Sequence, residues 1–200
     1  MSWFRRTPLA SARWVAIDCE TSGLDAARDR LLSVGAVAVR DGRIELADAF
    51  KAGVKQQAPS AADNILIHGI GGDAQLAGLP LPKVVASLAA YAGDGIPVAF
   101  HAPFDAAVLR RHGFRPRAPW LDLAQLAPAL LPGRKATLLD DWLAELGIPA
   151  DARHDALGDA FAAAQLLLVL LAQAARQRMD TVEALIRLGR ARQTLSRWRL

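Results

Sequence analysis

The chain has 200 residues, of which 52% are hydrophobic, so it can bury one substantial core and has little room for a second domain. Its 24 basic and 20 acidic residues give a net charge of +4, which suits a polyanionic partner. The single cysteine, Cys19, excludes an intramolecular disulfide and cysteine-rich zinc sites, and it fits a cytoplasmic location. The most apolar run, Ala160 to Ala175, contains two glutamines and is shorter than the roughly 20 residues of a membrane span, so we expect no membrane contact.

Strands are predicted mainly in the first half of the chain. Four segments have the apolar content of β-strands: Trp14 to Asp18, Leu31 to Arg40, Ile44 to Lys51 and Pro97 to Phe100. The Asp41-Gly42 turn between the second and third segments indicates a hairpin, so the sheet should begin with three antiparallel strands. Residues 55–81 show little of the hydrophobic periodicity that is typical of strands or helices.

Helices are predicted after this start and dominate the second half. Five segments have a helical pattern: Pro82 to Tyr91, Phe104 to Arg111, Leu121 to Leu130, Thr137 to Leu146 and Asp155 to Arg178. Strands followed by a helix, a further strand and more helices predict an α/β domain with layers of helix against a sheet.

Asp18 and Glu20 form the first pair of residues that can carry chemistry. Along a strand, successive side chains alternate between faces, so these two carboxylates should project together while Cys19 points the other way. Two carboxylates in one small volume repel each other, and divalent cations that prefer oxygen ligands would relieve that repulsion. The alternative is that both acids only end the strand and begin a turn.

Asp105 is the second candidate, at the point where the strand ending near Phe100 passes into a helix. The carboxyl ends of strands form the usual ligand-binding edge of open α/β sheets, so an aspartate here is well placed for a metal. It is equally well placed to stabilise the N-terminus of the helix through the macrodipole.

His154 and Asp159 supply the third candidate site. Asp155 and Asp159 are four residues apart and should share a helix face, with His154 at or just before the helix start. One alternative is an acid-rich helix N-terminus beside a surface histidine. Another is the His-Asp pair of an HD-type phosphohydrolase, but that site needs further histidines on neighbouring helices, and the other three histidines fall in or near the strand-containing half.

Taken in order, these segments resemble the DEDDh 3′–5′ exonucleases, the epsilon-like group that contains the proofreading subunit of bacterial DNA polymerase III. The resemblance rests on four stretches: Asp18 to Leu24, Ile67 to Ile70, His101 to Asp105 and His154 to Ala160. Two positions depart from the family pattern, since Ala102 stands where asparagine is common and Gly71 where threonine is usual. Neither position supplies a carboxylate ligand for a metal, so we expect these departures to alter details of the site while the activity is retained.

The resemblance implies a ribonuclease-H-like fold, with a mixed β-sheet flanked by α-helices, and hydrolysis with two Mg²⁺ or Mn²⁺ ions. It implies that Asp18 bridges the ions, that Glu20 and Asp159 complete one metal's shell, and that Asp105 holds the other directly or through water. His154 would take the proton of the attacking water, because its reference pKa lies near 6.5.

The resemblance also implies which residues bind substrate. The turn residues Thr21, Ser22, Gly23 and Leu24 would cradle the terminal nucleotide. Ile67, His68 and Phe104 would wedge or stack against the terminal bases, and Asp63 would reach the 3′ hydroxyl. The expected reaction releases 5′-mononucleotides from single-stranded DNA ends, with short RNA as the alternative substrate and little base preference.

Residues 1–175 are assigned to a single exonuclease domain, and residues 176–200 to a basic, helical C-terminal tail. This tail has Trp198 between two arginines and can bind phosphate, or dock on a polymerase or another protein partner. It can also be a solvated helix face. A non-catalytic nucleic-acid-binding or assembly module that keeps the fold is the alternative from another functional class, and the presence of all four carboxylates favours the enzyme.

Overall fold

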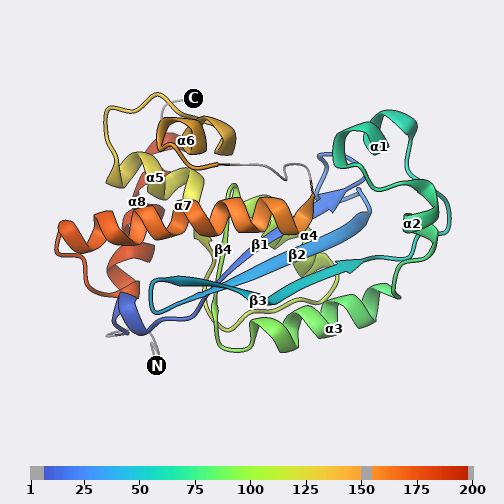
Figure 1. The fold of residues 1–200 in the computed structure, drawn as a ribbon, viewed down its shortest axis with the longest axis horizontal. Helices are drawn as coiled ribbons and strands as arrows, with labels where there is room; N and C mark the ends of the chain where they lie inside the picture. The colour runs from blue at the N-terminus through green and yellow to red at the C-terminus, as the bar shows by residue number, and fades with distance from the viewer. Residues whose placement is uncertain (1–6, 150–154, 198–200) are drawn as a thin grey trace.

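The computed structural model describes residues 7–149 and 155–197 (Figure 1). Its sheet has five strands in the order β3-β2-β1-β4-β5. Their bounds are β1 Trp14–Thr21, β2 Leu31–Arg40, β3 Arg43–Gly53, β4 Ile96–Ala99 and β5 Leu121–Asp122. The first three are antiparallel, whereas β4 pairs parallel with β1 and β5 pairs parallel with β4. The predicted mixed sheet is therefore confirmed.

Helices cover both faces of this sheet. A 3₁₀ turn over Leu9–Ser11 precedes β1. The α-helices are α1 Ala62–His68, α2 Gly72–Leu76, α3 Leu81–Ala92, α4 Ala102–Arg111, α5 Leu123–Leu130, α6 Leu139–Glu145, α7 Ala156–Arg176 and α8 Val182–Arg197. In Figure 1, α7 crosses the sheet diagonally on one face, and α3 runs below it.

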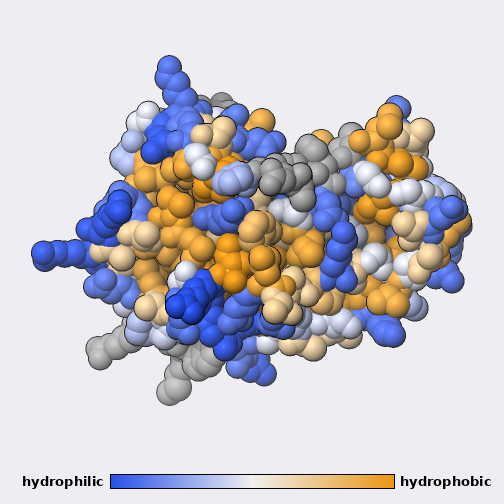
Figure 2. All heavy atoms as spheres, in the orientation of Figure 1, coloured by the Kyte–Doolittle hydropathy of each residue, from blue (hydrophilic) through white to orange (hydrophobic). Residues whose placement is uncertain are grey.

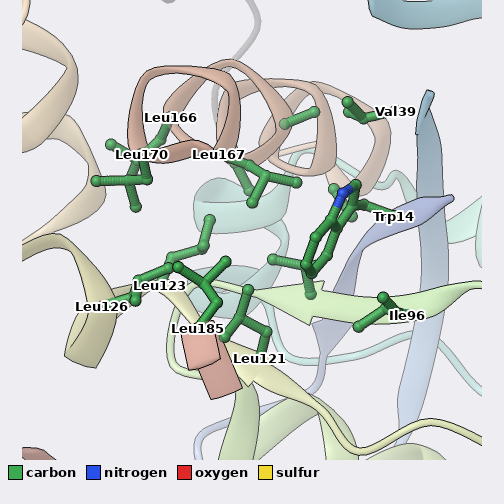
Figure 3. Close-up of a cluster of buried hydrophobic side chains, with 14 of the residues drawn as sticks. Trp14, Val39, Ile96, Leu121, Leu123, Leu126, Leu166, Leu167, Leu170 and Leu185 are labelled. Atoms are coloured by element: carbon green, nitrogen blue, oxygen red, sulfur yellow. The ribbon is translucent and has the colours of Figure 1, made fainter. Parts of the chain in front are cut away.

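Alternation along β1 divides the core into two parts. Trp14 and Ala16 pack with α5, α6, α7 and α8, whereas Val15, Ile17 and Cys19 pack with α3 and α4. Figure 3 shows Leu123 and Leu126 of α5 below Leu166, Leu167 and Leu170 of α7, with Trp14 of β1 to the right of these leucines.

The long apolar sequence of α7 is explained by its burial in the core. By length and composition alone the helix could cross a membrane. Its inner residues, including Leu166, Leu167 and Leu170, are buried in the core. Leu168 and Val169 are half-buried, and Figure 2 shows an orange band along the exposed side of α7 with blue side chains around it.

Apart from shifts of one or two residues at the ends of other elements, the structure differs from the predicted elements in three places. β1 continues to Thr21, so it carries Glu20 as well as Asp18. Residues 55–81, which lack periodicity, contain the short helices α1 and α2. The predicted helix from Leu121 begins only at Leu123, because residues 121 and 122 pair with β4 as a strand.

The predicted C-terminal helix is present as α8. Its residues Val182, Leu185 and Ile186 are buried in the core that α7 covers. This face of α8 is therefore held by apolar packing, and the basic residues Arg187 and Arg190 are exposed. The division of the chain at residue 175 stays a prediction.

Gly35 allows α7 to approach the sheet closely. Gly35 lies in β2 opposite Asp18 of β1. A Cβ atom at this position would lie 2.2 Å from the carbonyl carbon of Ala156 and 2.3 Å from the nitrogen of Leu157, much closer than non-bonded atoms can pack. The first turn of α7 therefore rests on the sheet with backbone against backbone.

We predict that Gly35→Ala lowers the free energy of unfolding by roughly 1–3 kcal/mol, the usual cost of overpacking a dense interior. The added methyl must push the start of α7 away from β2. Gly53→Ala is the matched control, because a Cβ at Gly53 meets no atom within 4 Å. Urea denaturation measures both variants, and equal stability of the two would contradict the close contact.

Candidate active site

Asp18 and Glu20 lie on the face of β1 that α7 covers. Both side chains are half-buried, and Cys19 between them is buried in the opposite core with α3 and α4. Strand alternation therefore acts as predicted. A bulge between Glu20 and Thr21 shifts the pairing with β2 directly after the two acids.

Asp159 completes a cluster with these two carboxylates. It stands in the first turn of α7, and carboxylate oxygens of Asp18, Glu20 and Asp159 all lie within 4.8 Å of one another. Three like charges this close repel, and hard divalent cations bind such oxygen sets. The three side chains thus form a metal-binding geometry assembled from β1 and α7.

Asp155 takes no part in that cluster and instead fixes the start of α7. It is the N-cap residue, and its carboxylate accepts the backbone N–H of Gly158 at 3.3 Å. The same carboxylate forms an ion pair with Lys51 of β3 at 2.6 Å. The cap satisfies a free N–H group at the helix start and joins α7 to the sheet edge. His154, the predicted base, lies outside the described residues.

Asp105 reaches β1 from the opposite face of the sheet. Its side chain, on α4, is 4% exposed, and it accepts the backbone N–H of Cys19 at 3.1 Å. Burial raises the pKa of Asp105 to about 7, with a smaller contribution from the charge of Asp122, while hydrogen bonds from Cys19 oppose the rise. The carboxylate thus contacts the backbone between the two acids of β1 and is not among the three clustered residues. Its role as a fourth ligand stays a prediction.

Asp122 was not singled out from the sequence, although it supports the start of α4. Its Oδ1 accepts the backbone N–H groups of His101 at 3.1 Å, Ala102 at 3.3 Å and Ala124 at 3.1 Å. His101 has a left-handed backbone with φ of 63°, which these bonds stabilise. An aspartate directly before a helix is an N-cap signal, which would have identified this residue.

The turn after β1 is held by Asp29, a second residue that the sequence did not single out. The Ser22 hydroxyl donates to the Asp29 carboxylate at 3.1 Å and accepts the Arg30 N–H at 2.9 Å. The other oxygen of Asp29 accepts the Asp25 N–H at 2.7 Å. A Cβ on Gly23 would lie 2.5 Å from that carboxylate, so a glycine fits here. These contacts give the predicted nucleotide cradle a defined shape.

Thr21 and Leu24 occupy the two ends of this cradle. The Thr21 hydroxyl donates to the carbonyl of Gly23 at 2.6 Å, which tightens the turn. The Leu24 side chain is 94% exposed, so it is available to an apolar partner such as a base. Phe104 on α4 is half-buried against the core shared with α3.

His68 is a structural residue of α1. It is buried, its Nδ1 accepts the Ile70 N–H at 2.9 Å, and its Nε2 therefore donates to Asn64 at 2.8 Å. The Asn64 amide in turn donates to the Thr21 carbonyl at 3.1 Å, which ties α1 to the end of β1. Burial lowers the pKa of His68.

Two other residues predicted to bind substrate, Asp63 and Ile67, belong to α1. Asp63 is exposed in the first turn of α1. Ile67 belongs to the same helix, and its side chain lies outside the described set. Base contact by Ile67, His68 or Phe104 stays a prediction.

Comparisons with known proteins identify the family of this chain. A family model described as Exonuclease (RNase_T) matches residues 15–167. An epsilon-like protein of DNA polymerase III from Rhodobacter capsulatus is 32% identical over 188 residues, which cover 90% of this chain and 27% of the relative. A PolC-type DNA polymerase III from Bacillus subtilis is 30% identical over 175 residues, which cover 84% of this chain and 12% of the relative. The chain thus spans about a quarter or less of these relatives.

Solved structures show the same fold. Exonuclease X in complex with 5′ overhanging duplex DNA has a TM-score of 0.72 and 24% identity, over 88% of this chain and 99% of that one. The nuclease domain of 3′hExo, a DEDDh family member bound to rAMP, has a TM-score of 0.70 and 17% identity, over 83% of this chain and 94% of that one. The predicted ribonuclease-H-like architecture is thereby confirmed.

We predict that replacing His68 by glutamine removes part of the acid sensitivity of the fold. Because the folded-state pKa of His68 is lowered, the unfolded chain binds a proton first as the pH falls below about 6.5, and stability is lost there. The difference in unfolding free energy between the native chain and His68→Gln should therefore narrow from pH 7 to pH 5. Urea titrations along this range test it, and parallel pH profiles would refute it.

Proposed function

Because the chain belongs to the Exonuclease (RNase_T) family, we propose that it is a 3′–5′ exonuclease that releases 5′-mononucleotides from single-stranded DNA with two divalent metal ions. The observation that carries the proposal is the cluster of Asp18, Glu20 and Asp159, whose oxygens lie within 4.8 Å of one another. Carboxylates held this close together repel one another, and a divalent cation bound between them would offset that repulsion. The cluster suits Mg²⁺ or Mn²⁺, which bind hard oxygen ligands.

The carboxylates of this chain would hold and orient the metals. Asp18 would bridge the two ions, and Glu20 and Asp159 would complete the shell of one. Asp105 would support the other, directly or through water, from its place against the Cys19 backbone. When bound, the ions activate a water and stabilise the leaving 3′ oxygen. His154 would accept the proton of that water, since an imidazole is partly neutral at pH 7.

The substrate assignment is supported by the surroundings of the cluster. The turn after β1, which begins at Thr21, carries the exposed side chain of Leu24, four residues after Glu20. One relative is a protein named as similar to the epsilon subunit of DNA polymerase III, and another is a PolC-type DNA polymerase III. Exonuclease X was solved with DNA, and these three likenesses favour DNA. The 3′hExo structure contains rAMP, so short RNA is the second candidate. A polymerase partner that docks on residues 176–200 stays a prediction.

We predict that the chain shortens single-stranded DNA labelled at its 5′ end into a ladder in the presence of Mg²⁺. Asp159→Asn should lower the rate by roughly 100-fold or more, because it removes an oxygen charge from the metal shell. Asp41→Asn is the matched control, since Asp41 lies in an exposed turn with φ of 50°, a conformation that asparagine also adopts.

Three outcomes of this assay would contradict the proposal. Internal cuts would refute the exonuclease direction, and activity that survives EDTA would refute the metal requirement. A well-folded chain that binds DNA and cleaves neither DNA nor short RNA would identify the non-catalytic binding module instead. Parallel reactions on single-stranded DNA, mismatched duplex DNA and short RNA rank the substrates.

We predict that His154→Ala lowers the turnover number by roughly 100-fold to 10,000-fold, the usual contribution of a general base. DNA affinity, measured with Ca²⁺ in place of Mg²⁺ to slow turnover, should change little. Equal losses in rate and in affinity would show that His154 binds substrate and does not act as the base.

A further inference from the structure

The outer face of α4 borders three hollows in the surface, which we call the α4 groove. Their volumes are about 1040, 510 and 420 Å³, and Arg110 lines all three. The largest lies between α4 and the segment 24–27, the second lies between α4 and α8, and the third lies between α4 and residues 114–120. One helix face thus joins the turn after β1 to the C-terminal helix.

The groove carries positive charge that the described part of the chain does not neutralise. Arg110, Arg111 and Arg115 are exposed, and none takes part in the ion pairs found among the described residues. Arg111 donates to the Asp29 carbonyl, and Arg115 donates to the Arg110 carbonyl. Carbonyl oxygens orient a guanidinium group but leave its full charge available to an anion.

The two acidic residues that line the groove are already engaged. Asp25 in the largest hollow lies 3.7 Å from Arg28, and Asp122 in the second accepts three backbone N–H groups. The neighbouring Arg117 differs from the groove arginines. It forms an ion pair with Asp94 at 2.6 Å and lines none of the three hollows.

One end of the groove lies at the turn that follows the carboxylates of β1. Its largest hollow includes Leu24, four residues after Glu20, so a strand whose end lies at the carboxylates would meet this hollow next. Asp105 on the inner side of α4 contacts β1, while Ala107 and Arg110 line the outer side of the same helix. Trp120 adds an aromatic surface to the other two hollows. Guanidinium groups and an aromatic ring along one channel are typical of sites for single-stranded nucleic acid.

We propose that the α4 groove binds the phosphodiester backbone of the strand under digestion, on the 5′ side of the nucleotides held at the carboxylates. This inference rests on the proposed function, because it assumes that the 3′ end occupies the cluster of Asp18, Glu20 and Asp159. Arg110 contributes most, since it borders every part of the groove. The groove then makes affinity depend on strand length.

The test compares Arg110→Gln with Arg117→Gln, two exposed sites with the same change of charge. Binding of fluorescent single strands of about 4 and about 15 nucleotides is measured with Ca²⁺ at several salt concentrations, lengths that bracket known single-strand sites. For Arg110→Gln, affinity for the longer strand should fall about threefold to tenfold at low salt. The slope of log affinity against log salt should decrease by about 0.7, the value for one lost phosphate contact. Affinity for the shorter strand should stay near that of the native chain, and Arg117→Gln should match the native chain throughout.

Two results would overturn this inference. Equal losses of affinity in both variants would show that the basic surface attracts DNA without a specific binding groove. A loss confined to duplexes with a 5′ overhang, with single strands unaffected, would assign the groove to the complementary strand. Failure of the proposed function is seen separately, because an inactive chain would release no p-nitrophenol from the p-nitrophenyl ester of thymidine 5′-monophosphate, a substrate too short to reach the groove. Binding that depends on length and on Arg110, in a chain that hydrolyses nothing, would uphold the groove and refute the exonuclease proposal.

Discussion

The contact between Gly35 of β2 and the first turn of α7 sets the position of the carboxylate cluster of Asp18, Glu20 and Asp159. Gly35 lies opposite Asp18 in the sheet, and the backbone of Ala156 and Leu157 occupies the space where a side chain at residue 35 would be. Asp159 follows in the same turn and therefore meets the acids of β1. Because the packing is dense, a single methyl group at residue 35 would disturb this contact. The position of α7 on the sheet therefore depends on the absence of a side chain at Gly35.

The second constraint is that β1 contributes functional groups to both faces of the sheet. Its even-numbered acids face α7, while Cys19 faces α4 and donates its backbone N–H to Asp105. Burial raises the pKa of Asp105 to about 7. A divalent cation near this carboxyl would favour its ionised form, so metal binding and the charge of Asp105 should be linked. Asp122 supports the arrangement by fixing the left-handed turn at His101.

Local pattern was sufficient to predict the parts of the site that depend on periodicity. Alternation placed Asp18 and Glu20 on one face, and a long apolar run identified α7 with Asp159 at its start. Contacts between distant segments could not be predicted in this way. The bond of Asp105 to the strand backbone depends on tertiary packing, as does the burial of His68. The helix Ala62–His68 was missed because tertiary bonds, such as that of Asn64 to the Thr21 carbonyl, support a segment with weak periodicity.

The most direct test of the account is a crystal structure with Mn²⁺ and a nucleoside 5′-monophosphate, in which anomalous scattering locates the metal. Strong anomalous peaks are expected in contact with oxygens of Asp18, Glu20 and Asp159, beside the nucleotide phosphate. Peaks elsewhere on the surface, or a nucleotide bound with the three carboxylates free of metal, would contradict this expectation.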